Sequence, residues 1–340
     1  MTADPTASDA TVQSGDAARN HSPFWSVMIP TYNAPRHLLE KCLQSVLGQD
    51  PGPDVMQIEV VDDCSPEGSP EELVHRIGKN RVALYKSPRN LGMAGCYNRM
   101  IERAEGQWVH ILDQDDLVLP EFYARLRSGI ENRDDVGAAF CRFAYVDGDG
   151  HWLGLGDLER RTPGVIADFY PRLAAQQRIQ IASLVVRKTI YQQVGPYRKD
   201  FVYALDWEMY LRICLMSHFW YEPSILACYR LHGASTTARL ARRAIEVREL
   251  TTFLDGAEAQ FPKINGRSPF GQARVWYSLR ALETANEFRS QGEITAAVEH
   301  LRAAWRLQPS IALVRGTFRF LLSLLKQQTK RIGVQTVTGS

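Results

Sequence analysis

The sequence predicts an α/β fold with a mostly parallel sheet, followed by an α-helical region. Short apolar runs alternate with helical patterns between residues 24 and 112, which implies right-handed crossovers between parallel strands. Polar motifs follow three of these apolar runs, and that edge of an α/β sheet is where ligands bind. The last third of the chain has helical periodicity almost throughout.

In the first half, four apolar runs are predicted strands, at 24–30, 58–61, 81–85 and 108–112. Helical spacing predicts helices at 36–47, at 71–77, and from the glycine-containing loop 89–95 to about residue 104. The first strand ends at Pro30 and Thr31, where the chain enters a loop.

The second half is less regular. From 136 to 158, β-like runs surround the turn Asp147-Gly148-Asp149-Gly150. An apolar run at 179–186 precedes a helix that begins at Lys188. A further helix at 206–216 and a strand at 225–230 complete this half.

Residues 238–340 are predicted to be helical. Helices at 273–289 and 294–307 are separated by Gln291-Gly292, so 273–309 resembles one tetratricopeptide-like hairpin. One such unit cannot bury both faces. It is therefore expected to pack on the α/β part or on a second copy of the chain, which would give a homodimer.

An amphipathic helix is predicted at the carboxyl end. Apolar and basic side chains are interleaved over 311–331. Ordinary packing on the hairpin or on a dimer partner is the favoured arrangement. The alternative is a peripheral contact of this helix with the inner face of a membrane.

The composition is that of a globular protein and excludes several classes. The 340 residues are 45% hydrophobic and 23% charged, with a formal net charge of +2. That charge lacks the basic excess of a nucleic-acid binder, so no nucleic-acid partner is expected. The 6 cysteines form no CxxC pair or Cys/His cluster, which excludes a zinc ribbon and favours a reducing, cytoplasmic location.

Residues 1–22 are predicted to be a disordered tail. They are rich in small and polar residues and contain no apolar stretch typical of an export signal. No run reaches the roughly 18 apolar residues that a membrane span needs. A cytoplasmic protein is the resulting expectation.

The acidic run Asp113-Gln114-Asp115-Asp116 directly follows the fourth strand. Three carboxylates in four residues repel one another unless a cation lies among them. Their hard oxygens suit Mg²⁺ or Mn²⁺, which often shares its coordination sphere with substrate phosphates. The alternative is a solvated turn in which Asp115 or Asp116 caps the next helix. A second acidic pair, Asp62-Asp63, ends another strand and favours a ligand site.

In order and spacing, these motifs resemble those of family-2 glycosyltransferases of the GT-A fold. The matching segments are Ile29–Asn33, Val61–Ser65, Asn90–Gly92 with Asn98, Leu112–Asp116, Gly195–Tyr197, Leu205–Glu208, and Tyr229–His232 with Ser235. Each motif is weak alone, whereas the ordered set is specific. The resemblance covers about 24–237.

The resemblance implies a GT-A catalytic domain over 23–237, with helices on both faces of its sheet. Residues 23–120 would be the nucleotide-sugar half and 121–237 the acceptor half. The implied reaction is inverting, metal-dependent transfer of a sugar from a nucleotide donor, favoured to be UDP-linked. The acceptor would be a hydroxyl group, as in polysaccharide, glycolipid or glycoconjugate biosynthesis.

The resemblance also assigns a nucleotide site. Pro30, Thr31 and Tyr32 would line the base and ribose. One of Asp62 and Asp63 would accept the uracil N3–H, for which a carboxylate is a suitable partner. The alternative for Asp63 is an Asx-turn with Ser65. The other implied nucleotide-binding residues are Asn33, Asn90, Gly92, Asn98, Asp113 and Gln114.

Asp113 and Asp115 correspond to the family's DxD element, and Asp115 is the preferred ligand of Mn²⁺ or Mg²⁺. Such an ion would neutralise charge on the leaving nucleotide. By the same resemblance His232 reaches the metal or the diphosphate. The alternative is a structural or solvated histidine.

Asp206 corresponds to the general base, since the acceptor hydroxyl must lose a proton as it attacks. Glu208 is the second candidate, and the alternative makes Asp206 only a helix N-cap. The chain departs from the family at Leu205, where many relatives have an acidic residue. It also has Cys96-Tyr97-Asn98 where relatives often have Ala-Arg-Asn, so a basic side chain near the nucleotide is missing.

Two other functions compete with sugar transfer. A nucleotidyltransferase would need a glycine-rich phosphate loop, but 30–35 contains no glycine. A non-catalytic adaptor would not need Asp113, Asp115 and Asp206 together.

Overall fold

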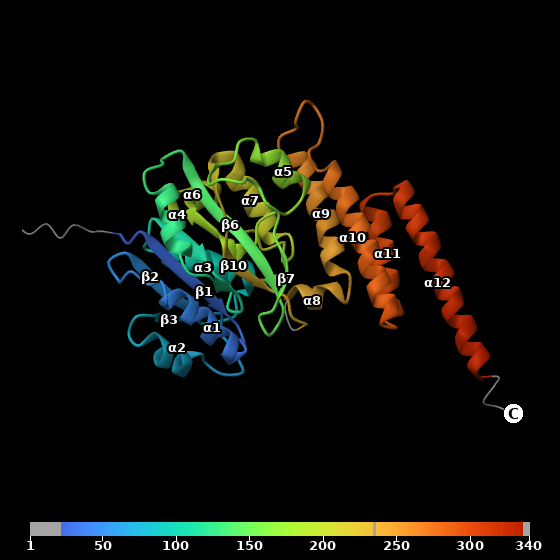
Figure 1. The fold of residues 1–340 in the computed structure, drawn as a ribbon, viewed down its shortest axis with the longest axis horizontal. Coiled ribbons are helices and arrows are strands. Elements are labelled where there is room, and N and C mark those ends of the chain that lie inside the picture. The colour runs from blue at the N-terminus through green and yellow to red at the C-terminus, as the bar shows by residue number, and fades with distance from the viewer. Residues whose placement is uncertain (1–21, 234–235, 336–340) are drawn as a thin grey trace, which may run out of the picture.

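The computed structural model describes residues 22–233 and 236–335 (Figure 1). It confirms the predicted fold class, because ten strands form one mixed sheet with helices packed on it and more helices following. The path through the sheet is β3-β2-β1-β4-β9-β6-β10-β5, with β7 and β8 attached at its side. Except for residue 22, the expected tail lies outside the described residues.

The first half of the sheet is parallel, as predicted. Its strands are β1 (Trp25–Thr31), β2 (Met56–Asp62), β3 (Ala83–Lys86) and β4 (Trp108–Ile111). The connecting helices are α1 (Arg36–Leu47), α2 (Glu71–Gly78) and α3 (Gly92–Arg103). Strand β1 pairs in parallel with β2 on one side and β4 on the other. It is almost entirely buried, which explains its continuous apolar run.

The second half adds antiparallel pairs. Its strands are β5 (Leu117–Val118), β6 (Val136–Val146), β7 (Trp152–Leu155), β8 (Gly164–Val165), β9 (Leu184–Arg187) and β10 (His218–Arg230). Strand β9 runs antiparallel to both β4 and β6, whereas β6 and β10 are parallel. Strand β10 is longer than the predicted 225–230 because its first residues pair with β6.

Helices cover both faces of the sheet. Those of the second half are α4 (Phe122–Ile130), α5 (Phe169–Ala175), α6 (Lys188–Val194) and α7 (Leu205–Met216). One apolar cluster joins the sheet to α1, α2 and α4, and another joins it to α3, α5, α6 and α7. The sequence did not predict α4 and α5, which are short and begin without a side-chain cap.

The helical region contains α8 (Thr236–Ala241), α9 (Ile245–Gln260), α10 (Gly271–Ser290), α11 (Ile294–Leu307) and α12 (Ile311–Gln335). The predicted hairpin corresponds to α10 and α11, which Gly292 connects at a φ of +84°. Positive φ explains the glycine at this turn. Its assignment to the tetratricopeptide class stays a prediction.

The helical region packs on the α/β part through α9 and α10. The ring centroid of Trp207, in α7, lies 5.0 Å from that of Phe253 and 5.4 Å from that of Tyr277. In addition, one oxygen of Glu249 accepts hydrogen bonds from three consecutive backbone amides just before α7, at 202–204, over 2.7–2.9 Å. The two parts therefore share one apolar core.

Helix α12 lies at the end of the molecule farthest from β1–β3 (Figure 1). Within the described residues, no helix is both long enough and apolar enough to cross a bilayer.

Candidate functional site

The ends of β1, β2 and β4 bring the predicted nucleotide residues to one edge of the sheet. Because these strands are parallel neighbours, their carboxyl ends meet there. The amide of Asp63 donates a 2.9 Å hydrogen bond to the carbonyl of Thr31. Pro30 and Thr31 are the last residues of β1, so the loop that follows them begins at this edge.

Side chains tie the first loop to its neighbours. The amide of Tyr32 donates to Oε1 of Gln114 over 3.0 Å, which joins the loop after β1 to the acidic run. Asn33 has a φ of +50°, and its amide donates to Oγ of Ser65 over 3.0 Å. The ring of Tyr32 remains exposed, as a residue that lines a base requires.

Asp62 and Asp63 have different partners. Oδ1 of Asp62 accepts from the amide and the hydroxyl of Ser65, over 3.1 and 2.6 Å. The two oxygens of Asp63 accept from the amides of Leu91 and Gly92, over 2.8 and 3.0 Å. The alternative that placed Asp63 in a turn with Ser65 is therefore wrong, because Asp62 makes that turn. Burial raises the pKa of Asp63.

Asn90 and Asn98 also differ. Oδ1 of Asn90 accepts from the amide of Gly92 over 3.0 Å, so Asn90 shapes the loop before α3. The side-chain amide of Asn98 instead bridges the backbone of Tyr197, accepting over 2.7 Å and donating over 3.0 Å. Asn98 is thus a positioning residue for the segment before α7, and its nucleotide contact stays a prediction.

The acidic run is not a helix cap. It leads into strand β5, and the next helix, α4, begins at Phe122. Asp116 is buried, and its Oδ1 accepts from the amide of Arg230 over 2.8 Å. Its Oδ2 is buried without a partner among the described residues. The cap alternative for Asp115 and Asp116 is wrong, since the chain forms a strand there.

Asp113 lies between a tyrosine and two other carboxylates. Burial, followed by the charges of Asp115 and Asp206, raises the pKa of Asp113 to about 8. The hydroxyl of Tyr97 donates to Oδ1 of Asp113 over 2.8 Å. From the sequence, Tyr97 is only the residue that stands where relatives often have an arginine. The structure adds it to the site as the partner of Asp113.

Asp115 and His232 form a pair at the same edge. Nε2 of His232 lies 2.7 Å from Oδ2 of Asp115, and both side chains keep about a fifth of their surface exposed, at 17% and 21%. A carboxylate oxygen and an imidazole nitrogen suit Mn²⁺, and a carboxylate suits Mg²⁺. Burial and, after it, the charges of Asp115 and Asp206 raise the pKa of Asp113, and a cation here would relieve the repulsion among these carboxylates. The residues therefore fit a divalent ion.

A second group of three possible metal ligands lies in the β6–β7 turn. One donor atom each from Asp147, Asp149 and His151 lies within 4.8 Å of the others. However, Oδ1 of Asp147 already accepts three backbone amides, over 2.8–2.9 Å. This group is a capped turn.

Arg230 connects that turn to the acidic run. Nε of this buried arginine donates to the carbonyl of Asp115 over 2.7 Å. Its Nη1 donates to the carbonyls of Asp147 and Gly148, over 2.9 and 3.0 Å. Arg230 belongs to the motif Tyr229–His232, but the sequence assigns no role to its side chain. Its three carbonyl partners are distant along the chain, so no local pattern predicts them.

Asp206 has the surroundings of a general base. It is the second residue of α7, whose N-cap position is Ala204, so the N-cap alternative is wrong. Asp206 is partly exposed as a residue, but its Oδ1 is buried without a partner among the described residues. Burial raises the pKa of Asp206 to about 7. Its charge contributes to the raised pKa of Asp113, so the two carboxyls are close.

Glu208 has a structural role. It is buried, and its carboxylate accepts three hydrogen bonds from Arg212 over 2.8–3.1 Å. Arg212 in turn donates to the carbonyls of 194–196. The structure therefore does not favour Glu208 as a base. Leu205, the departure from the family, is 1% exposed and belongs to the core.

Comparison with known proteins identifies relatives of the chain. The family model described as glycosyl transferase family 2 matches residues 26–188. An uncharacterised glycosyltransferase of Rickettsia prowazekii is 23% identical over 233 residues, which cover 68% of this chain and 71% of the relative.

Two solved structures share the fold. The mannosyltransferase PcManGT from Pyrobaculum calidifontis, in complex with GDP-Man and Mn²⁺, has a TM-score of 0.56 at 20% identity, covering 92% of this chain and 84% of its own. Residues 1–349 of TarS from S. aureus, in complex with UDP-GlcNAc, have a TM-score of 0.53 at 14% identity, covering 82% and 90%.

Proposed function

Because the chain belongs to glycosyl transferase family 2, we propose that it transfers a sugar from a UDP-linked donor to an acceptor hydroxyl, with inversion and with a divalent metal. One observation carries the proposal. Asp206, beside Asp113, has a carboxylate oxygen that no described residue contacts by a hydrogen bond, and burial raises the pKa of Asp206 to about 7. A base is most effective when its pKa lies near the working pH.

Asp206 would remove the proton of the acceptor hydroxyl. As that oxygen bonds to the anomeric carbon, the bond from this carbon to the diphosphate oxygen breaks, and the proton moves to Asp206. The amino end of α7 favours the anion and would lower its basicity. Burial opposes this effect and keeps the carboxylate basic.

The nucleotide would lie over the loops that Gln114 and Ser65 join. Thr31 and the exposed ring of Tyr32 would face the base and ribose, and Asp62 or Asp63 would accept the uracil N3–H. The TarS complex with UDP-GlcNAc supports a UDP donor, whereas the mannosyltransferase complex makes GDP the second choice.

Asp115 and His232 would hold Mn²⁺ or Mg²⁺, with Asp113 beside them. When bound, the ion would neutralise the charge that develops on the leaving diphosphate. Arg230 fixes the backbone of Asp115, and Tyr97 orients Asp113. These contacts keep the carboxylates in place before any substrate arrives.

Calorimetric titration tests the donor site. UDP, GDP and dTDP would each be titrated with Mn²⁺ and with a chelator, on wild type and on Asp115→Ala. We expect UDP to bind with Mn²⁺ and to lose this binding in Asp115→Ala. Binding of GDP alone would replace the UDP donor. Failure of every nucleotide under every condition would overturn the proposal.

We also propose a peripheral contact of α12 with an anionic membrane. Its exposed apolar side chains recur at helical spacing and are Ile311, Val314, Phe318, Leu321 and Leu322. The 25 residues of α12 include no Asp or Glu, and the exposed Arg315 and Arg319 lie among the apolar ones. Such a face suits anionic lipid and a lipid-linked acceptor. A homodimer through this face is the alternative.

A further inference from the structure

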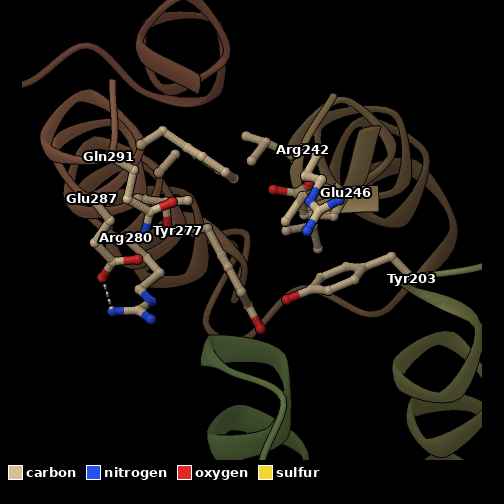
Figure 2. Close-up of a pocket in the computed structure, with 13 residues that line it drawn as sticks. Tyr203, Arg242, Glu246, Tyr277, Arg280, Glu287 and Gln291 are labelled. Carbon is tan, nitrogen blue, oxygen red and sulfur yellow. Dashed lines mark ion pairs between the residues drawn. The ribbon is translucent and has the colours of Figure 1, made fainter. Parts of the chain in front are cut away.

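A cleft of about 360 Å³ lies between α9, α10 and the segment before α7 (Figure 2). The hydroxyls of Tyr203 and Tyr277 point toward one another at its base. Arg242 and Glu246 line one side, and α10 lines the other. Its volume is in the range of small-molecule sites, and the proposed reaction has not used it.

One lining residue of the cleft, Tyr203, is near the proposed base along the chain. Tyr203 precedes Asp206 by three residues, and consecutive Cα atoms are 3.8 Å apart, so their Cα atoms are within about 11 Å. The amide of Tyr203 donates to Glu249 of α9 over 2.7 Å. The wall of the cleft and the start of the base helix are thus held together.

Two polar side chains of the cleft, Glu246 and Arg242, have atoms without a partner among the described residues. Glu246 is 8% exposed, and its Oε2 is buried without a partner among the described residues. Its Oε1 lies 3.5 Å from Nε2 of His300, but this nitrogen is closer to the carbonyl of Ala241, at 2.6 Å. Arg242 is exposed, and no ion pair of its guanidinium is found within the described ranges. These groups offer both a hydrogen-bond acceptor and donors.

The charged side chains that line the cleft do not favour an anionic ligand, because they are equal in number. Two arginines and two glutamates line the cleft, and Arg280 already lies 3.0 Å from Glu283 and 4.0 Å from Glu287. A phosphate would face Oε2 of Glu246, a buried acceptor that offers it no hydrogen-bond donor. A neutral ligand whose hydroxyls both donate and accept matches these groups better.

Aromatic side chains complete the match. Tyr203, Tyr277 and Phe288 line the cleft together with the aliphatic Val247 and Leu250. A sugar ring has apolar C–H faces that can pack on such side chains and hydroxyls that reach the polar ones.

We propose that this cleft binds a sugar ring of a glycan acceptor, while the hydroxyl to be glycosylated lies at Asp206. The inference rests on the proposed transfer reaction and names the acceptor class for it. The sugar ring in the cleft would be a neighbour of the reacting sugar, because Tyr203 and Asp206 belong to one short segment.

Direct binding of simple glycosides tests the cleft. The probes are methyl β-D-glucopyranoside, methyl α-D-mannopyranoside and methyl β-D-galactopyranoside, titrated into the full chain by saturation-transfer NMR, and inorganic phosphate, titrated by phosphorus-31 NMR line broadening. The proteins are wild type, Tyr203→Phe, Arg242→Ala and the control Arg243→Ala. Arg243 is exposed like Arg242 but does not line the cleft.

We expect at least one glycoside to bind wild type and Arg243→Ala equally. Its affinity should fall about fivefold in Tyr203→Phe and in Arg242→Ala, since each loses a hydrogen-bond donor. The proposal is overturned if no glycoside binds wild type, or if both cleft variants bind as wild type does. Phosphate binding that depends on Arg242 would also overturn it, in favour of an anion site.

A separate measurement keeps this test apart from the donor proposal. UDP is titrated with Mn²⁺ into the same wild-type protein. Failure of UDP binding would count against the donor site, whereas the glycoside titrations judge the cleft on their own.

Discussion

Nε2 of His232 lies 2.7 Å from Oδ2 of Asp115, although 117 residues separate them along the chain. His232 follows β10, and Asp115 lies in the segment between β4 and β5. The buried Arg230, two residues before His232, holds the carbonyl of Asp115 and so maintains this approach. The pair offers a carboxylate oxygen and an imidazole nitrogen to a divalent ion.

Replacing His232 should weaken the metal-dependent binding of nucleotide. We expect His232→Ala to lower the affinity for UDP with Mn²⁺ by about 10–100-fold and to leave the affinity in chelator unchanged. His151→Ala is the matched control, because His151 is exposed in the β6–β7 turn. Equal affinities of wild type and His232→Ala by calorimetry would return His232 to a structural role.

The rate of transfer should depend on the ionisation of Asp206. Its pKa is raised to about 7, and a base acts only when deprotonated. The single-turnover rate should therefore rise about tenfold per pH unit below 7 and level off above it. Asp206→Asn should lower the rate by about 10²–10⁴-fold.

The control for the rate measurement is Asp200→Asn, which removes an exposed carboxylate six residues earlier.

The melting temperature of Asp206→Asn provides a second measurement. Since burial raises the pKa of Asp206 above that of the unfolded chain, the contribution of Asp206 to the free energy of unfolding is lost as pH rises from about 4 to 7. Asp206→Asn should therefore melt above wild type at pH 8. A normal rate in Asp206→Asn would exclude Asp206 as the base.

Glu208 should matter for stability and not for proton transfer. Glu208→Gln weakens a largely buried ion pair with Arg212, so the free energy of unfolding in urea should fall by up to about 3 kcal/mol. The rate per folded molecule should stay within about tenfold of wild type. A loss as large as that of Asp206→Asn, without a loss of stability, would make Glu208 a catalytic base.

Helix α12 should bind anionic vesicles. Wild type should float with vesicles that contain phosphatidylglycerol, less so at high salt, and not with phosphatidylcholine alone. Phe318→Glu with Leu321→Glu should lower the bound fraction more than tenfold, because two exposed apolar anchors are lost. The control is Leu215→Glu, which changes an exposed leucine at the end of α7. Unchanged flotation of the double variant would rule out this face.

Much of the first half could be predicted because each element has a local signal. Helix α1 was predicted at 36–47 and observed at Arg36–Leu47, since its apolar residues recur on one face. The acidic run was found because a buried strand immediately precedes it. In contrast, α4 begins after Glu121 with a φ of +71°, so no usual cap marks its start.

The partners within the site could not be predicted in the same way. The helix cap expected at Asp116 is wrong, because Oδ1 of Asp116 accepts from the amide of Arg230, 114 residues away. Its position near a metal stays a prediction. The basicity of Asp206 depends on burial by other elements, which no neighbouring residue reveals. The cleft beside Tyr203 combines three separate segments.

Because Glu249 lies in the carboxyl-terminal helices, loss or exchange of this part of the gene should affect the catalytic part. A premature stop codon just after residue 237 would leave every residue proposed for donor binding and proton removal translated. The shortened product would nevertheless lack the single oxygen that accepts the amides of Val202, Tyr203 and Ala204. Exchange of the helical segment between related genes should therefore preserve function only where an acceptor at position 249 is inherited with it.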